Sequence, residues 1–248
     1  MCGRYAASRR PEDLALEFEA VPAEGQAPLP ADHNVAPTKD VYVVRHKKER
    51  DAEGALTGGG HRELRVVRWG LVPSWAKDVS IGNRMLNARV ESLAEKPAFR
   101  SAAASRRCLV PADGWYEWAP RPDRPGKQPF YVTPEDGSGL ALAGLWEVWG
   151  RGADRLYTCT LITAPAVGAL REVHPRMPLV LPPERWAEWL DPAREDVTEL
   201  TGPTPPEHVA RLEIRPVGSA VGNVAHNGPQ LTARLEPVSE PADQPALF

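Results

Sequence analysis

The second residue of the chain, Cys2, combines a side chain and a position that could capture an aldehyde. A small residue at position 2 favours removal of the initiator methionine, which would leave Cys2 as the N-terminal residue. Its α-amine, with a pKa of about 7.7–8.0, is partly neutral near neutral pH, whereas a lysine amine, with a pKa of about 10.4, stays protonated. After the amine has formed an imine, the adjacent thiol closes a five-membered thiazolidine ring. A cysteine in a flexible terminus without function is the alternative.

Two stretches carry polar side chains that could take part in such a reaction. In "NARVES", Asn87, Arg89 and Glu91 alternate, so an extended chain would project all three to one side. In "CLVPADGWYEW", Glu117 lies between two aromatic residues after an Asp-Gly turn. Apolar surroundings keep a carboxyl protonated, as a general acid requires. Each stretch is also compatible with an ordinary solvated strand.

Two further stretches place a histidine and a tryptophan in constrained backbone. "HPRMP" has proline after His174 and again after Met177, which favours extended backbone and sends His174 and Arg176 to the same side. "WGLVPSWAKD" places Trp75 in a Pro-Ser turn, where its ring could stack on a nucleobase. A structural histidine and a core tryptophan are the alternatives.

Length and composition indicate one globular domain. The chain has 248 residues, of which 42% are hydrophobic and 25% are charged. It contains no apolar run of membrane-spanning length and no signal-peptide core, so a cytoplasmic location is expected. Three cysteines without CxxC spacing argue against a disulfide framework or a zinc site, and we expect Cys108 and Cys159 to be buried and inert. The net charge of -3 requires any nucleic-acid binding to come from a local basic patch.

The elements that must position these residues are mostly strands. Helical spacing predicts helices at 11–21, through Leu14, Phe18 and Val21, and at 182–190, where Trp186, Trp189 and Leu190 share one side. Runs of β-branched and aromatic residues predict strands at 41–45, 64–69, 107–111, 129–132, 140–149, 156–163 and 177–181. Residues 49–61 and 119–129 are polar and rich in Gly and Pro, which favours exposed connections. We expect an α+β domain over 1–236 and a disordered tail over 237–248.

The order and content of these stretches closely resemble the SRAP (SOS-response-associated peptidase) family. Its members begin Met-Cys-Gly-Arg and carry Asn-Ala-Arg, Asp-Gly-Trp-Tyr/Phe-Glu-Trp and His-x-Arg-x-Pro motifs, all present here. The likeness continues through "HNVAPT", "AGLWE", "LITA" and "VGNVAHNG" and covers nearly the whole chain. It implies a single β-rich domain with a mainly antiparallel, barrel-like sheet core and a few short flanking helices. It also implies a sensor that crosslinks covalently to abasic sites in single-stranded DNA and shields them, without a cofactor or a metal.

The resemblance also assigns roles to residues of this chain. Cys2 would supply both nucleophiles, while Glu117 and His174 would move protons and Asn87 would orient the adduct. The residues expected to contact DNA are Gly3, Arg4, Pro37, Trp75, Arg89, Thr163 and Arg176. Family members often have a second aromatic residue directly after the one equivalent to Trp75, where this chain has Ala76. That departure leaves the strength of base stacking open.

The last five residues, "QPALF", are similar to the Gln-x-x-Leu-Phe peptides through which bacterial DNA-repair proteins dock on the sliding clamp. Gln244, Leu247 and Phe248 are therefore predicted to bind the replication clamp from the tail. We further expect a monomer that joins the nucleoid at sites of damage.

Two other functions remain open from the sequence. Cys2, Asn87, Glu117 and His174 are residue types found in thiol peptidases and amidohydrolases, and removal of the chain's own Met1 is the form of that activity most compatible with the family name. The other is a noncovalent reader of single-stranded or modified DNA, which would not need Cys2.

Overall fold

The computed structural model describes residues 2–51, 53, 55–121 and 125–235. The predicted tail, 237–248, lies outside the described residues, and so do Gln244, Leu247 and Phe248. In the part of the chain that is described, no helix is long and apolar enough to cross a membrane.

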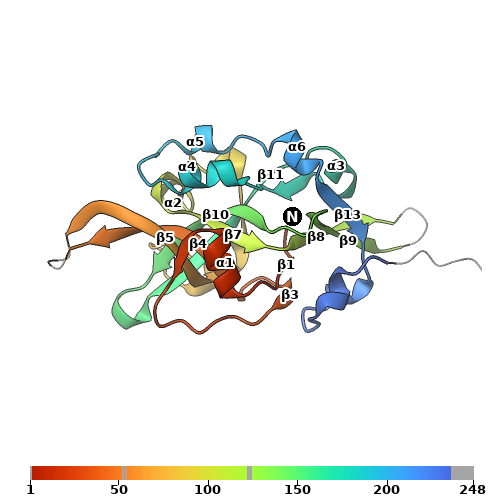
Figure 1. The fold of residues 1–248 in the computed structure, drawn as a ribbon, viewed down its shortest axis with the longest axis horizontal. Coiled ribbons are helices and arrows are strands. Elements are labelled where there is room, and N and C mark those ends of the chain that lie inside the picture. Colours follow the sequence, from red (N-terminus) through yellow and green to blue (C-terminus); the bar gives the residue numbers. More distant parts are fainter. Residues whose placement is uncertain (1, 52, 54, 122–124, 236–248) are drawn as a thin grey trace, which may run out of the picture.

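The strands within the described residues form two sheets. The smaller sheet is antiparallel throughout and has the order β13-β9-β8-β1-β3. Its strands are β1 (Tyr5–Ala7), β3 (Asp32–Val35), β8 (Gly114–Pro120), β9 (Lys127–Pro134) and β13 (Leu212–Pro216). This sheet lies beside the barrel that the larger sheet forms (Figure 1). Within it, β1 is hydrogen-bonded to β8 and neither is an edge strand.

The larger sheet has the order β12-β11-β10-β7-β4-β5-β2, and β6 pairs with β11. Its strands are β2 (Ala20–Pro22), β4 (Asp40–Arg50), β5 (Leu56–Trp69), β6 (Asn87–Arg89), β7 (Arg107–Ala112), β10 (Leu140–Trp149), β11 (Leu156–Pro165) and β12 (Arg176–Pro178). Because β11 also pairs with β5, the strands β11, β10, β7, β4 and β5 close into a ring. The predicted barrel-like, mainly antiparallel core is therefore confirmed, with parallel pairing only of β5 with β11, β6 with β11 and β2 with β5 among the described strands.

Alternate side chains along these strands point to opposite faces of the sheet, and both faces are hydrophobic. One cluster draws on every strand of the ring, through Val43, Val67, Cys108, Leu142 and Cys159, all at most 3% exposed, so it fills the barrel. Burial raises the pKa of both thiols, which are buried as predicted. The opposite faces of the same strands form a second cluster, which the helices cover.

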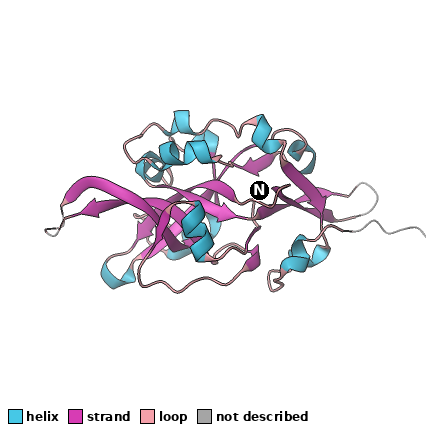
Figure 2. Cartoon of the chain, viewed as in Figure 1, coloured by secondary structure: helices cyan, strands magenta, loops and turns pink. Residues whose placement is uncertain are grey.

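Short helices cover the outer face of the barrel (Figure 2). They are α1 (Pro11–Glu17), α2 (Arg100–Ser105), α4 (Trp186–Leu190) and α5 (Val197–Leu200). Two further helices, α3 (Leu170–Val173) and α6 (Pro206–Val209), contact the other cluster through Leu170 and Val209. Phe18, which follows α1, stacks on Trp186 of α4 with ring centroids 4.5 Å apart. Trp186, Trp189 and Leu190 are buried as predicted, although the predicted helix over 182–190 begins as a 3-10 turn.

Three expectations about the elements were wrong in part. The first helix ends at Glu17, and Val21 is instead 55% exposed in β2, which pairs with β5. The strand predicted at 177–181 is the shorter β12, because its second half makes only an isolated bridge through Val180. Residues 119–129 are not wholly a connection, because β8 runs to Pro120 and pairs there with Lys127 of β9.

The largest departure from the sequence prediction is the segment 49–61. It belongs mostly to β4 and β5, which continue beyond the barrel as a two-stranded arm (Figure 1). Along the arm, His46 pairs with Arg62 and Lys48 pairs with Gly60. Backbone hydrogen bonds and polar side-chain pairs, such as His61 with Glu49 at 3.7 Å, join these two strands, so the segment needs no apolar alternation that a sequence pattern could detect.

Candidate functional site

The pairing of β1 with β8 brings Cys2 beside Glu117. Tyr5 is paired with Trp115, and the Tyr116 N–H donates to the Arg4 carbonyl at 2.9 Å. Continued by two residues, this antiparallel register places half-buried Gly3 opposite Glu117. Cys2 itself is fully buried in the cluster that fills the barrel.

The charge of Glu117 acts on the Cys2 thiol. The Glu117 side chain is buried, and this desolvation raises its pKa to about 7. The pKa of the Cys2 thiol is raised by its own burial and, secondly, by the negative charge of Glu117. At neutral pH Glu117 is therefore partly protonated, and the Cys2 thiol beside it keeps its proton.

Asn87 connects the N-terminal strand to the barrel. It begins β6, which runs parallel to β11 with Asn87 opposite Leu161. The Asn87 Nδ2 donates to the Cys2 carbonyl oxygen at 2.9 Å. Its Oδ1 is buried and has no hydrogen-bond partner among the described residues, which leaves one acceptor available beside Cys2.

The prediction that Asn87, Arg89 and Glu91 project from one side of an extended strand is wrong for Glu91. β6 ends at Arg89, and Glu91 lies in the 3-10 turn that follows, so it leaves the extended face. There it accepts two hydrogen bonds from the Arg176 guanidinium, at 2.5 and 3.1 Å. These bonds lower the pKa of Glu91.

Arg176 and Thr163 meet at the edge of the site. Besides its bonds to Glu91, the Arg176 Nη2 donates to the carbonyl oxygen of Thr163 and, at 3.2 Å, to its Oγ1. Thr163 is only 1% exposed and is paired with Arg89 across the β11–β6 ladder. The guanidinium of Arg176 is thus fixed by the protein before any ligand arrives.

His174 follows α3 in extended backbone. Its Nδ1 lies 3.0 Å from both the backbone nitrogen and the carbonyl oxygen of Arg176, so it can accept from the first or donate to the second, depending on the tautomer. Burial lowers the pKa of His174, and the positive charges of Lys127 and Arg176 lower it further. The ring is therefore neutral near neutral pH.

Arg4 is held by a buried amide that the sequence analysis did not single out. The Arg4 Nη1 donates to Asn34 Oδ1 and to the Val221 carbonyl, both at 2.8 Å. Asn34 is fully buried, and its Nδ2 donates to the carbonyls of Asn223 and His226 at 3.0 and 2.9 Å. The signal was present, because Asn34 and residues 221–228 lie in "HNVAPT" and "VGNVAHNG", in which only Pro37 had been given a role.

The other predicted DNA contacts lie at the surface. Trp75 is 59% exposed in its turn, where the next carbonyl, of Ala76, accepts a hydrogen bond from Trp149 Nε1 at 2.7 Å. Arg89 is exposed, and Pro37 is half-buried. No hydrogen bond within the described chain joins these three side chains to Cys2.

Lys127 is a second residue that the sequence analysis missed. It is exposed at the start of β9, and its positive charge lowers the pKa of both Glu117 and His174 as a minor effect beside burial. The sequence held no signal for it, since it lies in "APRPDRPGKQP", which predicts a connection. Its charge places it near both proton-transfer candidates.

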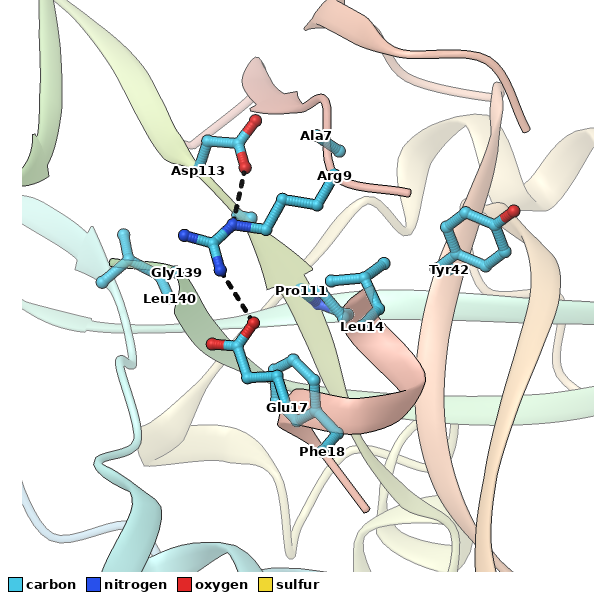
Figure 3. A pocket seen from close by; sticks show the side chains of 11 residues that line it. Ala7, Arg9, Leu14, Glu17, Phe18, Tyr42, Pro111, Asp113, Gly139 and Leu140 are labelled. Atoms are coloured by element: carbon cyan, nitrogen blue, oxygen red, sulfur yellow. Dashed lines mark hydrogen bonds and ion pairs between the residues drawn. The ribbon is translucent and has the colours of Figure 1, made fainter. Parts of the chain in front are cut away.

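A pocket elsewhere has no part in this arrangement. Figure 3 shows Arg9 between two carboxylates, with Glu17 at 2.8 Å and Asp113 at 3.4 Å. The pocket has an internal volume of only about 10 Å³, room for no more than a water molecule, and none of the predicted site residues lines it.

The fold and this convergence of residues define a β-barrel protein with a buried N-terminal cysteine. The family model of the SOS response associated peptidase (SRAP) matches residues 1–224, and the chain belongs to this family.

Curated relatives and a solved structure match the chain over almost its full length. It is 34% identical to the abasic site processing protein YoqW of Bacillus subtilis (strain 168) over 232 residues, covering 93% of this chain and 98% of the relative. It is 31% identical to the abasic site processing protein YedK of Escherichia coli (strain K12) over 249 residues, covering 96% and 100%. A crystal structure of a Bacteroides thetaiotaomicron protein shares the fold with a TM-score of 0.77 at 22% identity, covering 95% and 100%.

Proposed function

We propose that this protein recognises abasic sites in single-stranded DNA and shields them by a covalent thiazolidine link to Cys2, exposed as the N-terminus when Met1 is removed. Two relatives that match nearly the whole chain are named abasic site processing proteins. The observation that carries the proposal is the arrangement at Cys2. Its carbonyl is held by Asn87, and its thiol lies beside a carboxyl whose pKa is about 7.

The proposed reaction is a condensation with the ring-opened sugar. The Cys2 amine adds to the C1′ aldehyde, and the resulting carbinolamine loses water to give an imine. The Cys2 sulfur then attacks the imine carbon, the C=N π electrons move to nitrogen, and the thiol proton is transferred there. The product is a thiazolidine, and the only molecule released is one water. The same steps in reverse would make the link slowly reversible.

Glu117 has the protonation behaviour that these steps require. With a pKa of about 7, it can donate a proton to the departing hydroxyl of the carbinolamine and accept one from the thiol in the next step. A base is needed for the second step, because burial and the Glu117 charge both raise the pKa of the Cys2 thiol. A carboxyl with an ordinary pKa would remain ionised throughout.

His174 and Asn87 are assigned complementary roles. His174 is neutral near neutral pH, and in the tautomer whose Nδ1 accepts from the Arg176 N–H, its Nε2–H can donate to the sugar 4′-oxygen region during ring opening and take the proton back on reversal. The Asn87 Nδ2 fixes the Cys2 backbone, and its unpartnered Oδ1 can accept from the Cys2 amine or a sugar hydroxyl.

The DNA strand is proposed to follow the surface around Cys2. Arg4, Arg89 and Arg176 are the proposed phosphate contacts, of which Arg4 and Arg176 are already oriented by protein hydrogen bonds. Exposed Trp75, with Pro37, would pack against the bases that flank the lesion. Gly3 would allow close approach of the strand, and Thr163 would complete the phosphate contact of Arg176.

A comparison of N-terminal variants tests the covalent step. Wild type is expected to retain labelled single-stranded DNA with one abasic site through denaturing electrophoresis, and Cys2→Ala is expected to lose that band while keeping native binding. Cys2→Ser keeps the amine but lacks the thiol, so its imine should survive only after borohydride reduction. Retention by Cys2→Ala under denaturing conditions would overturn the proposal. If Cys2→Ala loses the denaturant-resistant adduct and keeps native binding, the protein is not a purely noncovalent reader of DNA.

The family description favours one further activity, removal of the chain's own Met1. Glu117, beside the Cys2 thiol, is the group expected to assist such a cleavage. Glu117→Gln should then keep Met1 in purified protein, as mass spectrometry would detect. Complete removal in this variant would assign the step to a cellular aminopeptidase.

The C-terminal tail is proposed to bring the protein to replicating DNA. Leu247 and Phe248, with Gln244, form a peptide suited to the apolar pocket of a sliding clamp. A clamp pulldown should retain the full chain and lose a chain that lacks the last five residues. Equal retention of both would remove the clamp as a partner.

A further inference from the structure

A broad basic groove lies at the base of the β4–β5 arm. Its cavity has a volume of about 770 Å³. Six basic side chains surround it, from β4, from β5, from the residue after α2 and from the residue before β11: Arg45, Lys47, Lys48, Arg65, Arg106 and Arg155. None of the residues assigned to abasic-site capture lines it. We call these six residues and the space between them the basic groove.

The basic groove has an excess of positive charge. Buried Glu63 accepts from three of its cations, Arg45 at 2.7 Å, Arg65 at 2.9 Å and Lys47 at 3.1 Å. Glu147 is paired with Arg106 at 2.8 Å.

Exposed Lys48 and Arg155 form no ion pair within the described part of the chain. With Glu49 as the one further carboxylate in the lining, cations outnumber carboxylates here, although the whole chain has a charge of -3. An anionic partner is therefore attracted to this face in particular.

The aromatic rings of the groove are already occupied. The Arg45 guanidinium lies 4.3 Å from the Trp146 ring centroid and 5.4 Å from that of Tyr157, and Arg65 lies 4.3 Å from Tyr157. These rings hold the guanidinium groups in place by cation–π contacts. Because Trp146 already carries one guanidinium and Tyr157 carries two, stacking of unpaired bases on these rings is disfavoured, so the groove suits phosphates rather than splayed bases.

The groove is displaced along the barrel from Cys2. Tyr157 of β11 lines the groove, whereas Leu161 of β11 is paired with Asn87, which binds the Cys2 carbonyl. Four residues of strand separate Tyr157 from Leu161, about 13 Å at ~3.3 Å per residue. The arm extends from the groove away from the N-terminus (Figure 1).

We propose that the basic groove binds the phosphate backbone of double-stranded DNA, as a second nucleic-acid site separate from Cys2. Phosphates match the excess of guanidinium and ammonium groups, and the occupied rings favour a duplex, whose bases are stacked, over a single strand. The β4–β5 arm beside it is a two-stranded ribbon, an element that fits the major groove of a duplex. This site goes beyond the proposed abasic-site capture and does not depend on it.

The test measures binding of full-length protein to a labelled blunt duplex without abasic sites at several salt concentrations. Lys48→Glu and Arg155→Glu are made singly and together, because both side chains are exposed and without ion-pair partners, so folding should be unaffected. The double variant should bind the duplex about tenfold more weakly, and the slope of log affinity against log salt should fall by about 2. Arg211→Glu, an exposed arginine outside the groove, is the matched control for each single variant and should change binding less than twofold.

Two outcomes would overturn the assignment. Unchanged duplex affinity and slope in the double variant would show that duplex DNA does not use the groove. Loss of undamaged single-stranded binding with duplex binding intact would assign the groove to a single strand instead. Polyglutamate is tested in parallel as a probe for an acidic protein partner. If the double variant loses polyglutamate binding but keeps duplex binding, the groove is a site for an acidic protein.

A crosslinking assay on abasic single-stranded DNA separates this inference from the proposed function. The groove variants should crosslink at the wild-type rate, since none of the residues assigned to abasic-site capture lines the groove. Failure of wild type to crosslink would reject the proposed function alone. Normal crosslinking with unchanged duplex binding would reject the groove site alone.

Discussion

Cys2 is held in a state in which its thiol is unreactive until a neighbouring group takes its proton. Full burial raises the pKa of the thiol, and the Glu117 charge raises it further. The same burial raises the pKa of Glu117 to about 7, within reach of physiological pH. A nucleophile of this kind is protected from casual oxidation, because oxidants react with thiolates.

The raised pKa of Glu117 predicts a pH dependence of stability. Because the folded protein holds this proton more tightly than the unfolded chain, the contribution is complete below the ordinary pKa of 4.5 and is lost as pH rises to about 7. The loss is on the order of 3 kcal/mol. Urea unfolding of wild type and Glu117→Gln across this range should show the free-energy difference between them falling by that amount. A constant difference would mean that Glu117 titrates normally.

Asn87 is predicted to act by positioning the Cys2 backbone. Asn87→Ala removes the hydrogen bond to the Cys2 carbonyl, and a nucleophile free to shift by about 1 Å reacts about 100-fold more slowly. Single-turnover crosslinking of abasic single-stranded DNA measures this rate, with the urea midpoint as the control for folding. A wild-type rate in a variant that has lost Asn87 would show that β1 and β8 suffice to place Cys2.

At the scale of elements, Asn34 ties the N-terminal strand to the C-terminal segment. Asn34→Ala removes one bond to Arg4 and two to carbonyls of residues 223 and 226, which should cost about 2–4 kcal/mol of unfolding free energy. Asn34→Asp keeps the acceptor for Arg4 and loses both donors. Hydrogen exchange at 219–228 should accelerate in both variants, whereas Arg4 should be displaced only in Asn34→Ala. Unaltered hydrogen exchange at 219–228 in Asn34→Ala would show that Asn34 does not hold the C-terminal segment in place.

The strands of the barrel were predictable because their apolar residues are the physical cause of the barrel. The run at 140–149 coincides with β10, since its alternate side chains fill the two clusters. The arm was missed because polar residues face water on both sides of a two-stranded ribbon. Val21 was assigned to the helix because the helical spacing of apolar residues continues past Glu17. In the structure the helix ends there, and Val21 pairs with β5 instead.

The candidate site was predictable in composition but not in geometry. The residue types at Cys2, Glu117 and His174 indicate their chemistry, and the aromatic neighbours of Glu117 indicate its burial. Glu91 was misplaced because a 3-10 turn follows β6 immediately. The influence of Lys127 depends on the β8–β9 pairing, which no local pattern specifies.

For the molecule as a whole, the candidate reaction site and the basic groove occupy different parts of the barrel. The core of the barrel encloses the Cys2 thiol, while the excess of cations gathers around Arg45 and Arg65 at the base of the arm. With a chain of net charge -3, attraction to DNA is local and weakens with salt. The proposed covalent link would make retention of the lesion independent of that weak attraction.

The most direct test of this account is the intact mass, under denaturing conditions, of protein incubated with single-stranded DNA that carries one abasic site. The account predicts a species equal to the Met1-less protein plus the oligonucleotide minus one water, absent from Cys2→Ala and from undamaged DNA. Protein that has lost Met1 and yet forms no adduct at any salt concentration would contradict it.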